Sequence, residues 1–297
     1  MAEAGSGEPQ AEKERIADVF ERAARDYDQM GPRFHSVLGA RLVRLADIRA
    51  GQAVLDVASG RGASALPAAE LVGPRGRVVG VDLAARMVDE LRRDAGARGL
   101  RNLEVLIMDA EDLTFPDDAF DRILAGFCLL FFPRPEQALA GMWRVLKPGG
   151  RLAVSTWDST DTGWQWLDDL IEAYLPTSSA GRSCRHAVGG ATGSPAGMRS
   201  LLSQAGFEAI KVISESEVST YATEDDWWAS LWTRGKCGAL ERLETELGAA
   251  GLAEFEVTAR KRVRERNPPG PDGIRHVVPV LYSLAGKPRL IGGSHPA

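Results

Sequence analysis

The sequence predicts an α/β fold in which a seven-stranded, mostly parallel sheet carries helices on both of its faces. Two observations lead to this prediction. After an N-terminal helical pattern, short apolar runs alternate with helix-length amphipathic stretches, which is typical of parallel strands joined by helical crossovers. Each run is also almost wholly apolar, as expected of strands that helices cover on both sides. With 297 residues, 44% of them hydrophobic, the chain can fill a core of this size.

Helices are predicted ahead of the sheet. Residues 12–46 carry apolar side chains at helical spacing, interrupted by Gly31-Pro32. The residues before them are rich in Ala, Gly and Glu. We therefore expect a disordered tail over residues 1–11 and an N-terminal helical segment over residues 12–50.

The first five strands are expected within residues 51–157. They are the apolar runs 53–57, 78–81, 103–108, 122–127 and 152–156. The segment Lys147-Pro148-Gly149-Gly150 supplies a turn directly before the fifth run, which supports a strand start there.

The rest of the chain is predicted to return twice to the sheet and to add helical insertions. We expect a lid insertion at 158–195 with a helix near 164–174, a core continuation at 196–215 with the strand 207–214, a helical insertion at 216–272 with helices 224–247 and 252–266, and the last strand, 274–284, with a tail in 273–297.

Charge and hydropathy argue against nucleic-acid and membrane partners. Lys and Arg total 36 against 41 Asp and Glu, so a net charge of −5 would repel a polyanion. The longest apolar run, 123–132, is too short to span a bilayer and ends at Pro133. The N-terminus lacks the basic start and apolar segment of a signal peptide, so we expect a cytoplasmic protein. The spacing of Cys128, Cys184 and Cys237 fits neither a zinc site nor a disulfide framework, and no metal is expected.

The most informative segment joins the first predicted strand to the helix that follows it. Asp56 stands near the end of the strand, and Ala58, Ser59, Gly60 and Gly62 belong to the small-residue turn after it. Ligands of open parallel sheets bind outside the carboxyl ends of the strands, where small residues allow close contact with the backbone. A carboxylate in such a turn suits an amino-acid ammonium group better than a diphosphate.

Carboxylates also end the second and third predicted strands. Asp82 follows the turn by about twenty residues, a place suited to binding both hydroxyls of a ribose. Asp109 could accept from the exocyclic amine of adenine while Ala110 offers a backbone N–H. Any one of these acids could instead cap a helix. Together they indicate an adenosine that bears an amino acid, and the absent three-glycine fingerprint argues against a dinucleotide-dependent oxidoreductase.

These segments resemble the class I S-adenosyl-L-methionine (SAM) dependent methyltransferases, and within them the ubiquinone/menaquinone C-methyltransferase-like small-molecule group. The matching segments are Leu55-Asp56-Val57-Ala58-Ser59-Gly60-Arg61-Gly62, Gly80-Val81-Asp82-Leu83 with Met87, residues 109–116, Phe120-Asp121 and residues 144–152. The resemblance is close over residues 15–157 and extends to the rest only by architecture. It implies a three-layer, Rossmann-like fold.

The resemblance also implies where SAM would bind and S-adenosyl-L-homocysteine (SAH) would form. The turn after the first strand would hold the methionine part, the second strand end the ribose and the third the adenine. The expected cofactor contacts are Tyr27, Asp56, Ala58, Ser59, Gly60, Gly62, Asp82, Leu83, Met87, Asp109, Ala110, Glu111 and Phe127. Tyr27 lies in a segment similar to the family's Ala-x-x-Tyr-Asp and would stand near the reactive end of the cofactor.

Two departures from the family pattern have consequences for the site. Ala58 replaces a usual glycine, which is tolerable if the backbone there needs no positive φ. Leu130-Phe131 stands where many relatives carry a histidine pair, which predicts an apolar acceptor pocket.

Methyl transfer from a sulfonium needs a positioned nucleophile in a dry site and no metal. A phenol or carbon acid also benefits from a general base, most often histidine. His295 lies near the end of the chain and His276 opens a predicted strand, so His35 and His186 remain as candidate bases, with Tyr27 as a third catalytic candidate. A surface or core histidine remains the alternative for both.

Most tryptophans fall at the end of the fifth strand or in the predicted insertions. We expect Trp157, Trp164, Leu130 and Phe131 to contact a flat, apolar acceptor, although lid packing would explain the same pattern. The sequence thus predicts methyl transfer from SAM to an oxygen or carbon of a small, largely apolar molecule in natural-product biosynthesis. The alternative is a SAM-binding cyclase, isomerase or regulatory protein on the same fold. The oligomeric state stays open, and a homodimer is allowed.

Overall fold

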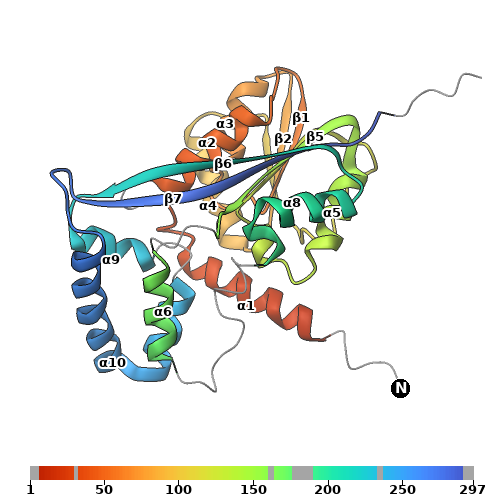
Figure 1. Cartoon of the computed structure of the whole chain (residues 1–297). Helices are drawn as coiled ribbons and strands as arrows, with labels where there is room; N and C mark the ends of the chain where they lie inside the picture. Colours follow the sequence, from red (N-terminus) through yellow and green to blue (C-terminus); the bar gives the residue numbers. More distant parts are fainter. Residues whose placement is uncertain (1–6, 30–32, 160–163, 176–189, 233–236, 290–297) are drawn as a thin grey trace, which may run out of the picture.

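The computed structural model describes residues 7–29, 33–159, 164–175, 190–232 and 237–289. Within these ranges it forms one seven-stranded sheet in the order β3-β2-β1-β4-β5-β7-β6 (Figure 1). The strands are β1 (Ala53–Val57), β2 (Arg77–Asp82), β3 (Leu103–Ile107), β4 (Phe120–Gly126), β5 (Leu146–Trp157), β6 (Glu208–Tyr221) and β7 (Ile274–Gly286). β1 to β5 are parallel, whereas β7 runs antiparallel to both β5 and β6. The predicted fold class is confirmed.

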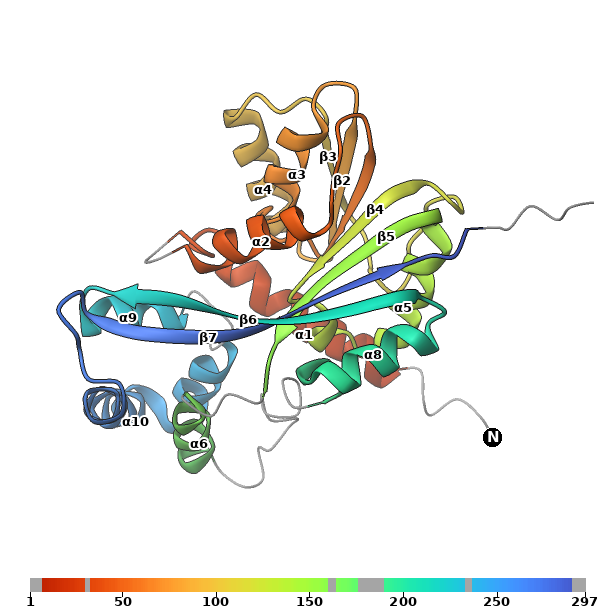
Figure 2. The same cartoon turned by 45° about the horizontal axis from the view of Figure 1, so that its top comes forward.

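Helices cover both faces of the sheet because successive strand residues point to opposite sides. Leu55 and Val57 of β1 pack in one apolar cluster with α5 (Pro135–Val145) and α8 (Pro195–Gln204). Val54 packs in a second cluster on the other side. The helices of that side are α2 (Phe34–Leu45), α3 (Ala65–Val72) and α4 (Ala85–Ala97) (Figure 2).

A group of helices, here called the lid, lies at the end of the β6–β7 hairpin that extends beyond β5. β5 pairs with β7 only from Arg151↔Gly286 to Trp157↔Val280, whereas the β6–β7 register continues to Tyr221↔Ile274. The outer part of the hairpin therefore leaves the sheet and reaches the lid helices (Figure 1). These are α6 (Gln165–Tyr174), α9 (Glu224–Trp232) and α10 (Cys237–Arg266), and their buried residues form a third cluster rich in aromatic side chains.

Several boundaries differ from those predicted. Helix α1 (Gly7–Ala23) begins before the expected start at residue 12, so residues 7–11 are helical and not a tail. β6 extends to Tyr221, so residues 216–221 belong to this strand instead of the predicted helical insertion. The predicted helix 224–247 is divided, since α9 ends at Trp232, and α10 continues to Arg266 with a break at Gly248, whose φ is 67°. None of the described helices combines the length and apolar character of a membrane span.

Candidate functional site

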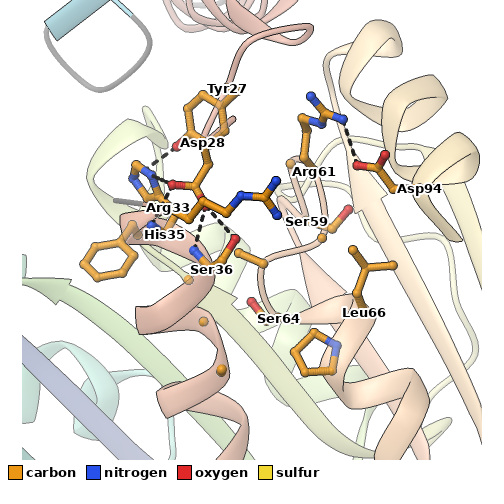
Figure 3. Close-up of a pocket in the computed structure, with 18 of the residues that line it drawn as sticks. Tyr27, Asp28, Arg33, His35, Ser36, Ser59, Arg61, Ser64, Leu66 and Asp94 are labelled. Carbon is orange, nitrogen blue, oxygen red and sulfur yellow. Dashed lines mark hydrogen bonds and ion pairs between the residues drawn. The ribbon is translucent and has the colours of Figure 1, made fainter. Parts of the chain in front are cut away.

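Two adjoining cavities lie at the carboxyl ends of the parallel strands. The first, here called the turn cavity, has a volume of about 460 Å³ and lies between the turn 58–64, the start of α2 and its preceding loop, and α3 and α4 (Figure 3). The second, the strand-end cavity, has a volume of about 120 Å³ and is lined by α1, residues 82–84 with Met87, residues 108–111 and the segment after β4. Both cavities are lined by Tyr27, Ala58, Gly60, Gly126 and Phe127.

The turn after β1 holds its shape through backbone bonds and left-handed residues. The Ser59 N–H donates to the Val81 carbonyl at 2.9 Å, which ties the turn to β2. Gly60 and Gly62 have φ of 50° and 81°, and Ala58 also has a positive φ, 52°. The sequence predicts that Ala58 is tolerated if the backbone there needs no positive φ, and the structure shows that it does need one. The left-handed backbone of Ala58 costs about 1–2 kcal/mol relative to glycine. A Cβ on Gly60 would meet no atom within 4 Å, so the turn is open toward both cavities.

Asp56 lies beneath this turn and lines neither cavity. The residue is 1% exposed, and its Oδ2 has no hydrogen-bond partner in the described part of the chain. Burial raises the pKa of Asp56 to about 8, with a further increase from the nearby Asp82, while the Ala65 N–H and the Ser64 hydroxyl act in the opposite direction. Asp56 thus contacts the start of α3, whereas the sequence predicted contact with the cofactor.

Asp82 connects the turn to the loop after β2 and lines the strand-end cavity. Its Oδ2 accepts from the Gly60 N–H at 2.8 Å, and its Oδ1 accepts from the Ala84 N–H at 2.9 Å. Burial raises the pKa of Asp82 despite these hydrogen bonds. Each carboxylate oxygen can accept a second hydrogen bond, so these two contacts are compatible with the diol contact that the sequence predicts for Asp82. Leu83 and Met87 line the same cavity.

A lysine that the sequence analysis did not identify reaches the third strand end. Lys13 of α1 places Nζ 2.6 Å from Asp109 Oδ2 and 2.7 Å from Glu111 Oε2. Glu111 also accepts from the backbone N–H of Arg134 at 2.6 Å and from its Nε at 2.9 Å. Burial lowers the pKa of Lys13, but the hydrogen bonds and charges of its two carboxylate partners raise it by more than burial lowers it. The pKa of Lys13 is therefore above its usual value. Asp109, Ala110 and Glu111, which the sequence predicts as cofactor contacts, line the strand-end cavity together with residues of α1.

At the junction of the cavities, Tyr27 contacts His35. The Tyr27 hydroxyl lies 3.2 Å from His35 Nε2, and the two rings stack with centroids 4.9 Å apart. On the far side of the imidazole, Nδ1 lies 3.6 Å from Asp28 Oδ1 (Figure 3). Two of the predicted catalytic residues are therefore in contact. The third, His186, lies outside the described residues.

Asp28 is buried and holds the start of α2. Its carboxylate accepts from the backbone N–H groups of His35 and Ser36 at 2.9 and 2.8 Å, and from the Ser36 hydroxyl at 2.6 Å. Burial would raise the pKa of Asp28, but hydrogen bonds from His35 and Ser36 and the proximity of the imidazole lower it below its usual value. Asp28 therefore remains a carboxylate at neutral pH.

Arg33 faces the turn cavity from the loop before α2 (Figure 3). Its backbone is left-handed, with φ 34° and ψ 49°. Arg61, in contrast, is held by other groups: its guanidinium lies 2.8 Å from Asp94 and 2.5 Å from the Arg25 carbonyl oxygen. Arg33 is therefore the better placed of the two cations to meet an anionic group at the turn.

Aromatic side chains form the wall beyond β4. Phe127 stacks on Trp157 with ring centroids 4.0 Å apart, and Trp157 stacks on Phe34 at 5.5 Å. Of the four predicted acceptor contacts, Phe131 lines the strand-end cavity, whereas Leu130 and Trp157 line neither the turn cavity nor the strand-end cavity. Trp164 packs in the lid cluster against His276, with ring centroids 4.3 Å apart. In the described ranges, no group of His, Cys, Asp and Glu could hold a metal ion.

Comparisons with known proteins agree with this geometry. Residues 9–165 match the model of the ubiE/COQ5 methyltransferase family. The chain is similar to the aklanonic acid methyltransferase DauC of Streptomyces sp. strain C5, with 39% identity over 48% of this chain and 66% of that protein. It is similar over almost its whole length to the nocamycin O-methyltransferase of Saccharothrix syringae, with 32% identity over 93% of this chain and 99% of that protein.

Solved structures share the fold. YcgJ of Bacillus subtilis superposes with a TM-score of 0.56 at 22% identity, covering 86% of this chain and all of that one. The [4+2]-cyclase SpnF superposes with a TM-score of 0.52 at 20% identity, covering 86% of this chain and 82% of that one. At these identities the likeness concerns architecture alone.

Proposed function

The chain belongs to the ubiE/COQ5 methyltransferase family, and we propose that it transfers the methyl group of SAM to an oxygen or carbon of a small, largely apolar natural product. The observation that carries the proposal is the junction of two differently lined cavities at Tyr27 and Phe127. One cavity offers an apolar cradle with carboxylates, and the other offers a glycine turn and a cation.

The residues present fit an adenosyl group that carries an amino acid. In the strand-end cavity, Asp82 would bind the ribose hydroxyls and Asp109 the adenine amine, with Met87 against the ring. In the turn cavity, the backbone of the turn would hold the methionine part, and Arg33 would pair with its carboxylate. The bound cofactor supplies an electrophilic methyl group on sulfonium.

The acceptor side is apolar. Phe127 stands at the junction of the two cavities and stacks on Trp157. Rigid aromatic walls favour a flat, apolar acceptor and exclude water from the transfer. The names of the two relatives that act on natural products support this substrate class.

The test is to incubate the protein with SAM and a panel of phenols, indoles, polyketides and prenyl compounds, and to measure SAH and methylated product by mass spectrometry. Methylation of at least one compound is expected. Product rearrangement without SAH would instead support the SAM-binding cyclase or isomerase alternative.

A second test addresses the cofactor site. We expect Asp82→Ala to abolish measurable SAH binding in calorimetry, because the diol acceptor and the Gly60 contact are both lost. Asp89→Ala on the exposed face of α4 is the matched control and should bind SAH normally. Equal affinities for the two variants would refute the assignment.

A further inference from the structure

The turn after β1 carries an arginine that contacts two other walls of the turn cavity. The side chain of Arg61 is only 10% exposed. Its Nη1 donates to the Arg25 carbonyl oxygen at 2.5 Å and lies 3.5 Å from that of Ala24. Its Nη2 lies 2.8 Å from Asp94 Oδ2 on α4 (Figure 3). One guanidinium therefore joins the turn to α4 and to the segment that follows α1.

That segment, residues 24–29, is here called the arm. It begins where α1 ends, and the Ala23 carbonyl still accepts from the Tyr27 N–H at 2.9 Å. The carbonyls at the end of a helix have no partners within it, and its dipole attracts a cation there. Arg61 supplies both a cation and hydrogen-bond donors at this end, although it lies far from α1 in the sequence.

The other side of the arm packs on apolar residues of the strand-end cavity. Ala24, Ala84 and Met87 are each 1% exposed and form one small cluster, and Phe20 and Tyr27 pack against it. Ala84 and Met87 line the strand-end cavity, whereas Arg61 lines the turn cavity. The arm is thus held from both cavities, and Tyr27, which lines both, lies on it.

Its burial and its partners distinguish Arg61 from an ordinary surface ion pair, which contributes little to stability. Arg93 is such a case, since it is 68% exposed and pairs with Glu90 at 2.7 Å. Arg61 also lies 3.4 Å from Glu90 Oε2, but it adds the carbonyls of the arm. A guanidinium presents several N–H donors in a fixed fork, so a lysine in its place could not hold these carbonyls and Asp94 at once.

We propose that Arg61 is a positioning residue for the methyl transfer, which fixes the arm so that Tyr27 closes the junction of the two cavities. This inference rests on the proposed function. Arg61 acts through Tyr27: with the guanidinium gone, the arm opens more often and the junction admits water. The turn itself keeps its shape, because the Ser59 and Gly60 N–H groups bond to β2 without Arg61. Loss of Arg61 should therefore lower the rate of transfer more than the affinity for the cofactor.

The first test needs no acceptor. Amide hydrogen exchange of residues 24–29 is measured on protein saturated with SAH. We expect roughly tenfold faster exchange in Arg61→Met, because the arm loses the donor that holds its carbonyls. Arg93→Met is the matched control, since it removes an exposed cation that also pairs with Glu90 and leaves the arm contacts in place. Equal exchange in these two variants would overturn the proposal.

A second variant guards against misfolding of the first. Arg61→Lys keeps a cation in the turn but can serve either the carbonyls or Asp94. The arm should then exchange faster than in Arg93→Met and more slowly than in Arg61→Met. If Arg61→Lys exchanged like the control, the proposal would fail as well, because the fork geometry would then have no role.

The kinetic test uses the compound that gives the fastest SAH production in the panel. We expect Arg61→Met to lower kcat about 10–100-fold at nearly constant KM for SAM, as a small displacement of a positioning group does. In a Tyr27→Ala background the same substitution should change kcat less than about twofold, because the two residues act as one unit. Additive losses would overturn the proposal and leave the methyltransferase assignment standing. Absence of SAH with every compound would refute the proposed function itself, and the exchange data would still show whether Arg61 holds the arm.

Discussion

The contact of Lys13 with the third strand end leads to a prediction about cofactor affinity. Lys13→Met keeps a long, flexible side chain in place but removes the charge that joins α1 to Asp109 and Glu111. Because α1 lines the strand-end cavity with Lys13, Ile16, Ala17 and Phe20, we expect the helix to dock less firmly and SAH to bind more weakly.

The size of the effect follows from the two contacts. A hydrogen bond to a charged group contributes about 1.5–3 kcal/mol, so two would give about 3–6 kcal/mol. Two facts reduce this sum. The Asp109 side chain is 28% exposed and can bind water instead, and Glu111 keeps Arg134 as a partner. A docking loss of about 2 kcal/mol remains, which corresponds to a roughly 30-fold increase in the Kd for SAH.

Calorimetric titration with SAH measures the affinity, and hydrogen exchange of the α1 amides reports the docking of the helix. Arg15→Met is the matched control on the same helix. The Arg15 side chain is 59% exposed, so its ion pair with Glu12 contributes little to stability. We expect the control to bind SAH like the unchanged protein. If Lys13→Met and Arg15→Met had the same Kd and the same exchange, the energetic role assigned to Lys13 would be wrong.

Three further predictions concern the turn cavity and its supports. Gly62→Ala should destabilise the protein by about 3 kcal/mol in denaturant unfolding, because the added Cβ would lie 2.3 Å from a methyl group of Leu91 and the residue has a positive φ. Gly51→Ala is the control: its φ is 83° but nothing lies within 4 Å of the added Cβ, so it should lose only about 1 kcal/mol. Equal losses would contradict the packing argument. Asp56 has a folded pKa raised from 3.8 to about 8, so the folded state holds a proton that the unfolded chain has released, and stability should fall as pH rises between about 4 and 8, by at most about 1.4 kcal/mol per unit. Asp56→Asn should flatten that slope in unfolding of the ligand-free protein, and an unchanged slope would exclude Asp56 as its source. Arg33→Met should raise the KM for SAM about tenfold at nearly constant kcat, since a carboxylate contact serves ground state and transition state alike, and a loss confined to kcat would contradict this role.

The placement of Asp82 and Asp109 beside one cavity was predictable because it depends on the order of strands along the chain. Each strand ends at the same edge of a parallel sheet, so acids that follow consecutive strands must lie near one another. Asp82 and Asp109 line the strand-end cavity for this reason. Asp56 differs because it stands inside β1, where alternation puts its side chain on the same face as Val54, toward α3. The alternation of side chains along a strand, with a period of two residues, already predicts this orientation of Asp56.

The outer part of β6 was missed because its environment changes along the strand. Residues 215–221 are polar apart from Val218 and Tyr221, a pattern unlike that of the buried strands. This part of β6 lies in the hairpin that leaves the sheet, so one face remains open to solvent. A two-stranded ribbon needs no continuous apolar run, and its sequence resembles a polar loop.

The role of α1 depends on partners too distant in the chain for any local pattern to reveal. One face of the helix closes the strand-end cavity through Lys13, while the opposite side meets the lid, where Arg22 pairs with Glu241 at 2.6 Å and Val19 lies against Gly238. The lid pair is well exposed and contributes at most about 1 kcal/mol, whereas Lys13 is almost wholly buried between two carboxylates. The cavity contact is therefore the stronger of the two, so Lys13 contributes more than the lid pair to the docking of α1.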